Sequence, residues 1–345
     1  MSRALRALLG AMGLAIVALV AYLTPPVSGV TRALLGLLSL VMIGFVWRWP
    51  QLEQRLAAED PAGGGPATGP RHPGPFDLAV GFITNFFDTL GIGNFATTTA
   101  ALKFARRIPD EDIPGTLNVG HAFPVLTEAL ILIAVIAVDP RLLIAMIVAS
   151  VLGAWLGAAA VARMPGRAIQ AAMGVALAIA AALFIVTNVH WKAGGASATA
   201  LSGTPFMVAV AGNFVLGALM TLGIGLYAPC LIMLSLLGLS PRAAFPIMMG
   251  SCALLMPVGG MRFVRTRRYS APVALGLAIG GPPAVLIAGY LVKSLPLTWL
   301  IWLVVGVVLY AAVMMLASAL RRPPASERAP AKLMQVTARA PEVGD

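Results

Sequence analysis

Charged residues are scarce in this sequence. Asp, Glu, Lys and Arg together make up only 11% of its 345 residues, against about 25% in a typical soluble domain. Hydrophobic residues make up 59%, and the mean hydropathy is +0.90. This composition excludes a water-soluble enzyme core, a disordered chain and a secreted disulfide scaffold, and it indicates a polytopic membrane protein.

Acidic residues are absent altogether between Asp139 and Glu327, and only two cysteines occur, Cys230 and Cys252. Both cysteines lie in apolar runs, so they predict neither a disulfide framework nor a metal site. The net charge of +11 comes from Lys and Arg clustered between apolar runs. Such clusters are typical of the cytoplasmic loops of membrane proteins. We therefore expect no cofactor, no metal and no nucleic-acid partner.

Apolar runs and the segments between them divide the chain into five parts. Residues 1–50 predict a transmembrane hairpin rather than a cleaved signal peptide, because a second apolar run follows the first at once. The Gly- and Pro-rich residues 51–75 predict a flexible cytoplasmic linker. Further spans are expected in residues 76–190 and 204–320, and residues 321–345 predict a disordered cytoplasmic tail.

A short motif occurs twice in the apolar region. Thr89-Leu-Gly-Ile-Gly93 recurs as Thr221-Leu-Gly-Ile-Gly225, 132 residues later. Phe82, Pro109 and Pro114 also recur at this offset, where they match Phe214, Pro241 and Pro246. This extent of identity predicts a duplication, and internal repeats of this kind are a recurring design of secondary transporters.

Glycines interrupt each copy of the repeated run at its middle. Glycine destabilises a continuous helix by about 1 kcal/mol, and a helix break frees backbone groups that lipid cannot satisfy. Each run is therefore expected to be a broken helix pair around Gly91–Gly93 or Gly223–Gly225. The alternative is a long tilted helix with a Gly-rich packing face.

The distribution of positive charge favours broken pairs that return to the side they entered. In that arrangement most basic residues of the core loops lie inside, as the positive-inside rule requires. These residues are Lys103, Arg106, Arg107, Arg163, Arg167, Arg262, Arg265, Arg267 and Arg268. The predicted fold is therefore an all-α membrane protein of two inverted repeats, each a re-entrant broken helix pair plus three spans, preceded by the N-terminal hairpin, with both termini cytoplasmic.

Few ionisable residues are expected at membrane depth, and each is a functional candidate because burying charge there costs several kcal/mol. Asp88 lies at the end of the first half-helix, where cations are favoured, so it could bind a coupling proton or Na⁺. It could equally be a hydrogen-bonded strut that stabilises the break. Glu128 and His121, seven residues apart, could form a proton relay or a satisfied polar pair.

The half-helix after each break begins with groups suited to an anion. A helix N-terminus offers free N–H groups and a positive dipole end, and Asn94-Phe-Ala-Thr-Thr-Thr99 adds neutral donors. The hydroxyls of residues 97–99 could instead bond back to their own helix. The candidate substrate-binding residues are Gly91, Gly93, Asn94, Thr97, Thr98, Gly223, Gly225, Tyr227 and Cys230.

The stretch from Gly81 to Ala100, Gly-Phe-Ile-Thr-Asn-Phe-Phe-Asp-Thr-Leu-Gly-Ile-Gly-Asn-Phe-Ala-Thr-Thr-Thr-Ala, resembles the sulfite exporter TauE/SafE family, also called the 4-toluene sulfonate uptake permease family. The resemblance extends over about residues 76–320 and leaves the N-terminal hairpin and linker outside. Members are bacterial inner-membrane carriers of small sulfur-containing or carboxylate anions, including sulfite, sulfoacetate, aryl sulfonates and thiosulfate. The resemblance implies that the site includes Asn85, Asp88, Gly91, Gly93 and Thr97.

The expected function is therefore that of a secondary transporter, or permease, for sulfite or an organosulfonate, coupled to H⁺ or Na⁺. No Gly-x-x-x-x-Gly-Lys-[Ser/Thr] sequence occurs, so ATP binding by this chain is not predicted. The alternatives are a carboxylate carrier, a cation carrier with Asp88 and Glu128 as ligands, and an intramembrane enzyme. The expected partners are the small anion and the lipid bilayer; direction and oligomeric state, a homo-oligomer included, stay open.

Overall fold

The computed structural model describes residues 3–23, 27–59, 72–90, 93–161, 198–223 and 225–291, with short pieces between 163 and 182 and between 309 and 320. Within these ranges the chain is helical apart from turns and one isolated bridge between Ala198 and Leu239. The expected all-α architecture is confirmed for this part of the chain.

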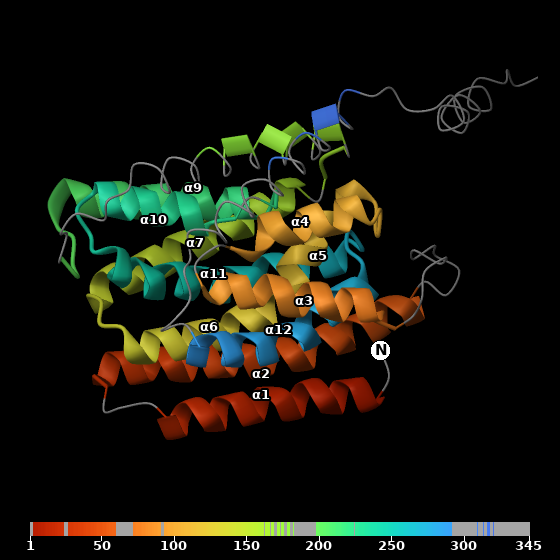
Figure 1. The fold of residues 1–345 in the computed structure, drawn as a ribbon, viewed down its shortest axis with the longest axis horizontal. Coiled ribbons are helices and arrows are strands. Elements are labelled where there is room, and N and C mark those ends of the chain that lie inside the picture. Colours follow the sequence, from red (N-terminus) through yellow and green to blue (C-terminus); the bar gives the residue numbers. More distant parts are fainter. Residues whose placement is uncertain are drawn as a thin grey trace, which may run out of the picture.

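The helices lie alongside one another in a bundle, with α1 and α2 at one edge and α9 and α10 at the other (Figure 1). They are α1 (Arg3–Leu23), α2 (Gly29–Glu59), α3 (Pro75–Thr89), α4 (Asn94–Phe104), α5 (Ile113–Gly120), α6 (Ala122–Val135), α7 (Pro140–Val161), α9 (Gly203–Met220), α10 (Tyr227–Leu236), α11 (Pro241–Arg265) and α12 (Ala271–Leu291), with a 3₁₀ turn η1 (Asp110–Asp112). Among the described residues, six helical segments are long and apolar enough to cross a membrane. They are Gly29–Leu56, Asp110–Val135, Pro140–Ala160, Gly203–Met220, Arg242–Arg265 and Ala271–Gly289.

The N-terminal helices pack against the rest of the bundle. α1 contacts α2 and α6, and α2 contacts α6 and α11. Helix α2 continues beyond its apolar run, so residues 51–59 of the expected linker are helical. Contacts with the α11–α12 loop hold this extension: Trp49 Nε1 donates to the Tyr269 hydroxyl at 2.9 Å, Tyr269 in turn donates to Glu53, and Arg267 donates to a backbone carbonyl of α2. Residues 60–71 of the expected linker and the C-terminal tail lie outside the described residues.

Glycines allow two helix pairs to approach closely. Helix α3 packs along α12, and α9 packs along α7. A Cβ atom on Gly81 would lie 2.7 Å from the Cα of Leu277, and one on Gly153 would lie 1.9 Å from the Phe214 carbonyl oxygen. Small residues at the contact are typical of helix association in membranes, where van der Waals packing replaces the hydrophobic effect. Each helix that precedes a break is thus held by a helix from the other sequence copy.

The two ends of each broken segment lie together. At the start of α3, both carboxylate oxygens of Asp77 accept hydrogen bonds from Arg107, which follows α4, at 2.9 and 2.8 Å. In the second segment, the N–H of Ser240, after α10, donates to the carbonyl of Ala198, before α9, at 2.8 Å. In each segment, therefore, the residues at the start and at the end are in direct contact.

These two closing contacts lie at opposite ends of the α5–α6 unit. The first is near Asp112, which precedes α5 and lies 3.8 Å from Arg268 of the α11–α12 loop. The second is near Asp139, which follows α6 and whose N–H donates to the carbonyl of Thr199 at 2.9 Å. The basic residues of the α4–α5 and α11–α12 loops accordingly gather at the Asp112 end.

Candidate functional site

Both repeated motifs interrupt a helix, as the glycines predict. Helix α3 ends at Thr89 and α4 begins at Asn94, while α9 ends at Met220 and α10 begins at Tyr227. Within the breaks, Gly93 and Gly223 have φ angles of 87° and 89°. Only glycine adopts this conformation without strain. Gly91 lies outside the described residues.

The two breaks touch each other reciprocally. A Cβ atom on Gly93 would lie 3.9 Å from the ring of Tyr227, and one on Gly225 would lie 3.6 Å from the Cβ of Phe95. Gly93 corresponds to Gly225 in the repeat, and Phe95 corresponds to Tyr227. Each copy therefore offers the same glycine to the same aromatic position of the other copy.

A small cavity of ≈ 10 Å³ lies at this contact. It has room for about one water molecule. Its lining residues come from the starts of α4 and α10, with one residue each from α6 and α9: Gly93, Asn94, Phe95, Val125, Met220, Gly225, Leu226 and Tyr227. The N-terminal ends of the two half-helices thus converge on one small cavity.

A buried amide network spans the first break. The Nδ2 atom of Asn94 donates to Asn85 Oδ1 at 3.0 Å and to Asp88 Oδ2 at 2.6 Å, which uses both of its hydrogens. Asn85 Nδ2 donates to the carbonyl of Gly81 at 2.6 Å. The three polar side chains are 4% exposed or less. In this closed arrangement Asn94 joins α3 to α4 rather than offering its amide to the cavity.

His121, between α5 and α6, continues this network. Its Nδ1 lies 3.0 Å from Asn85 Oδ1, and its Nε2 lies 2.9 Å from Thr98 Oγ1. Because the Asn85 oxygen accepts, Nδ1 carries a hydrogen. Both ring nitrogens have a partner, and in the neutral imidazole Nε2 accepts the Thr98 hydroxyl. Within the described chain no hydrogen bond joins His121 to Glu128.

Glu128, on α6, connects the two copies. Its Oε1 accepts from Thr89 Oγ1 at 2.8 Å, and its Oε2 accepts from the Tyr227 hydroxyl at 3.2 Å. That hydroxyl also lies 2.6 Å from the sulfur of Met249. Thr89 is a site residue that sequence reasoning did not single out. The sequence signal for Thr89 was that it starts the repeated motif. That signal is ambiguous, because its counterpart Thr221 bonds only within its own helix.

Asp88 directly precedes Thr89, which donates to Glu128, so its buried carboxyl group belongs to the same network as that of Glu128. Its Oδ2 accepts from Asn94, but no described residue donates to its buried Oδ1. The buried hydroxyl of Thr99 likewise has no partner among the described residues. The first copy therefore leaves a free carboxylate oxygen and a free hydroxyl inside the bundle.

Three other predicted site residues take no part in this network. Thr97 is half-buried, and its hydroxyl lies 3.2 and 3.0 Å from the carbonyls of Gly93 and Asn94 on its own helix. Cys230 is fully buried in α10 and Gly223 is buried in the second break, but neither lines the small cavity. In the described ranges, no group of three or more His, Cys, Asp or Glu side chains is placed to hold a metal ion.

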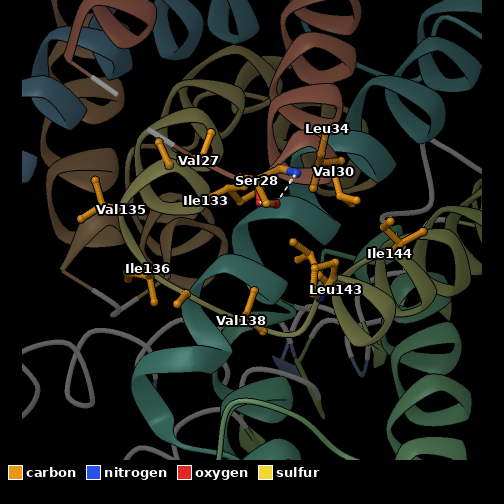
Figure 2. A pocket seen from close by; sticks show the side chains of 14 residues that line it. Val27, Ser28, Val30, Leu34, Ile133, Val135, Ile136, Val138, Leu143 and Ile144 are labelled. Atoms are coloured by element: carbon orange, nitrogen blue, oxygen red, sulfur yellow. Dashed lines mark hydrogen bonds between the residues drawn. The ribbon is translucent and has the colours of Figure 1, made fainter. Parts of the chain in front are cut away.

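A larger cavity of ≈ 400 Å³ lies between the start of α2 and the α6–α7 connection (Figure 2). Aliphatic side chains such as Val30, Leu34 and Ile133 line it, and its two hydroxyls, of Ser28 and Thr31, lie 2.9 Å from each other. The only side-chain donors in this lining are two hydroxyls that bond to each other, so it offers an anion little. The polar network between the two breaks is therefore the candidate functional site.

Several apolar spans, two broken segments and a buried polar centre between them define the class of helical, multi-pass membrane transporters. The chain belongs to the sulfite exporter TauE/SafE family, whose model matches residues 1–184. This match starts at residue 1, so our expectation that the resemblance begins near residue 76 and leaves the N-terminal hairpin outside is wrong. No curated protein and no solved structure in the comparisons matches the chain.

Proposed function

We propose that this protein is a secondary transporter of small sulfur oxyanions, such as sulfite or an organosulfonate, across the bacterial inner membrane. The convergence of the α4 and α10 starts on one cavity carries this proposal. Helix N-termini present unpaired N–H groups and a positive dipole end. Helix α4 has no side-chain cap on these groups. An anion between the two starts would meet donors from both copies without a buried counter-charge.

The proposed topology is a pair of inverted repeats whose broken segments are re-entrant. It is supported by the closing contacts at opposite ends of α5–α6 and by the reciprocal contact of the two breaks. A contact in which residue i meets j and j meets i is the mark of a two-fold relation. The gathering of basic residues at the Asp112 end supports cytoplasmic termini on that side.

Single cysteines at Arg106 and Arg242, labelled from each side of the membrane, test this topology. Arg106 follows α4 and Arg242 starts α11, so the two positions lie at opposite ends of the bundle. We expect Arg106→Cys to react only from the cytoplasm and Arg242→Cys only from the outside. Reaction of both from one side would contradict the inverted arrangement.

Transport also requires the site to open. The ≈ 10 Å³ cavity holds about one water, which is less than a sulfur oxyanion occupies. We infer that the structure represents a closed state and that the two halves open it alternately to each side. A coupling H⁺ or Na⁺ at Asp88 would offset the charge of the anion, which the free Oδ1 supports.

A thermal-unfolding series on purified protein in detergent tests the substrate class. Sulfite, alkyl and aryl sulfonates, thiosulfate, acetate and chloride are compared at matched ionic strength. A ligand at ~100 times its Kd stabilises the folded state by about 2.7 kcal/mol. We expect sulfite or a sulfonate to raise the Tm. A shift with acetate alone would favour a carboxylate carrier, and a shift with Na⁺ alone would favour a cation carrier.

The variant Asp88→Asn separates substrate binding from coupling. We expect it to keep the anion-dependent Tm shift and to lose coupled flux in proteoliposomes. Loss of the anion-dependent shift as well would contradict the division of roles between the half-helix starts and Asp88.

A further inference from the structure

We propose that the coupling ion is a single proton shared by Asp88 and Glu128, and that it crosses in the same direction as the anion. This inference rests on the transport function proposed above, and it names the ion and the second residue that holds it. The observation behind it is the hydrogen-bond inventory of four carboxyl oxygens buried between the two copies.

Three of these four oxygens already accept a hydrogen bond. Asp88 Oδ2 accepts from Asn94, Glu128 Oε1 from Thr89, and Glu128 Oε2 from Tyr227. The fourth, Asp88 Oδ1, is buried and has no donor among the described residues. An ionised carboxylate has no hydrogen to give, so two ionised groups leave Oδ1 unpaired and repel each other. One proton on either carboxyl group supplies the missing donor and removes one charge.

The same inventory disfavours Na⁺. Transporter Na⁺ sites are built from several backbone and carboxylate oxygens. Here three of the four carboxyl oxygens already accept a hydrogen bond, which leaves each of them a single lone pair for a cation. A proton needs only the fourth oxygen and its neighbour across the pair.

The surrounding titratable groups do not replace this proton. His121 donates from Nδ1 to Asn85 on α3, and its Nε2 is occupied by the Thr98 hydroxyl on α4. The Tyr227 hydroxyl from α10 donates to Glu128, and Cys252 from α11 contacts the sulfur of Met220 at 3.6 Å. Among the described residues, no Lys or Arg contributes to the electrostatic environment of Asp88 and Glu128.

The acid pair and the cavity share a residue, which links the proton to the anion. Asn94 lines the cavity and also holds Asp88 Oδ2. An anion beside two ionised carboxylates is repelled, and protonation of the pair removes part of that repulsion. By reciprocity the bound anion then favours the proton to the same degree. The proton and the anion therefore bind together, which is the condition for their transport in the same direction.

Proteoliposomes that contain the full chain, in Na⁺-free choline buffer with a pH dye inside, test the proposal. The substrate is a sulfonate that shifts unfolding, because a sulfonate carries no titratable proton of its own. We expect an inward sulfonate gradient to acidify the lumen without Na⁺. Asp88→Asn and Glu128→Gln should each abolish the acidification, whereas Glu111→Gln, an exposed acid outside the network, should not.

Binding measurements test the shared proton even where a variant does not transport. In the wild type, the Kd for the sulfonate should rise about tenfold per pH unit over the range in which the pair ionises. In Asp88→Asn the new amide donates in place of the proton, so binding should persist and lose its pH dependence. A flux that requires Na⁺, or a pH-independent wild-type Kd, would overturn the shared proton and leave the transporter in place. If no anion binds or moves, the proposed function itself fails.

Discussion

The first broken segment, α3–α4, and its counterpart 132 residues later, α9–α10, share a backbone plan but differ at the polar positions. Where the first copy has Asn85, Asp88, Asn94 and Thr98, the second has Gly217, Met220, Leu226 and Cys230. The same is true of the following helix, where His121 and Glu128 correspond to Ala253 and Gly260. Tyr227 is the second copy's one hydroxyl in the described network. The two segments therefore share their architecture, but only the first carries carboxyl groups.

Moving a carboxylate into the second copy is expected to have the largest effect. Met220 is 2% exposed and its sulfur contacts Cys252, so Met220→Asp would bury a carboxylate that has no donor. We expect a loss of about 3–5 kcal/mol, as when a buried charge loses its partner. Thermal unfolding in detergent measures it. The control Met220→Leu should cost less than about 1.5 kcal/mol. Equal stability of the two variants would show that the second copy tolerates a buried carboxylate as the first copy does.

The closing contacts of the two segments predict the next largest difference. Asp77 is fully buried, and its hydrogen bonds raise the pKa of Arg107, so Arg107→Ala would leave the carboxylate unpaired. Because Arg107 is partly exposed, we expect a loss of about 2–3 kcal/mol, somewhat less than for a fully buried pair. The second segment closes through a backbone bond, so Arg242→Ala, at its exposed end, should change stability by less than about 0.5 kcal/mol. Chemical denaturation of the two variants measures these losses. Similar losses in both would contradict the conclusion that an ion pair closes the first segment and a backbone bond closes the second.

The paired glycines Gly93 and Gly225 should respond differently to alanine. Gly93 has a φ of 87°, so Gly93→Ala is expected to cost about 1–2 kcal/mol of backbone strain. Gly225 has no such angle, and an added Cβ would make an ordinary contact with Phe95 at 3.6 Å. Gly225→Ala should therefore leave the Tm nearly unchanged and weaken anion binding by filling the cavity. A larger Tm loss for Gly225→Ala than for Gly93→Ala would reverse this interpretation.

The smallest effect is expected at Thr97, whose hydroxyl bonds only to carbonyls of its own helix turn. Thr97→Ala should change stability by less than about 0.5 kcal/mol, whereas Thr98→Ala should cost about 1 kcal/mol because His121 loses a donor. Titration with sulfite decides the role that the sequence left open. A weaker Kd in Thr97→Ala would place this hydroxyl in the substrate site of the open state, and an unchanged Kd would leave it a helix-internal group.

The parts of the site that sequence could predict depend on local chemistry. Glycines within an apolar run predict a helix break whatever the tertiary structure around them, and the breaks occur at Gly93 and Gly223. Asp88, His121 and Glu128 stood out because ionisable groups are costly at membrane depth, and all three are buried in the network.

The rest depends on how distant helices pack. The seven-residue spacing of His121 and Glu128 placed them on one helix face, yet their partners differ. His121 bonds to Asn85 and Thr98 on α3 and α4, and Glu128 accepts from Thr89 on α3 and Tyr227 on α10. The contact of Tyr227 with Glu128 joins residues 99 positions apart, and no local pattern predicts that separation. The helical extension of α2 over residues 51–59 likewise depends on Tyr269 and the loop around it.

The exchange of packing partners, α3 on α12 and α9 on α7, also constrains how the protein is made. At a synthesis rate of 5–20 residues per second, α12 follows α3 by roughly 10–40 s. During that interval α3, with its Asp and Asn side chains, has been translated without the glycine-lined surface that covers it in the finished fold. The first half of this protein therefore stays an assembly intermediate until the second half is inserted. During that time the polar side chains of α3 need a covering in the membrane other than α12.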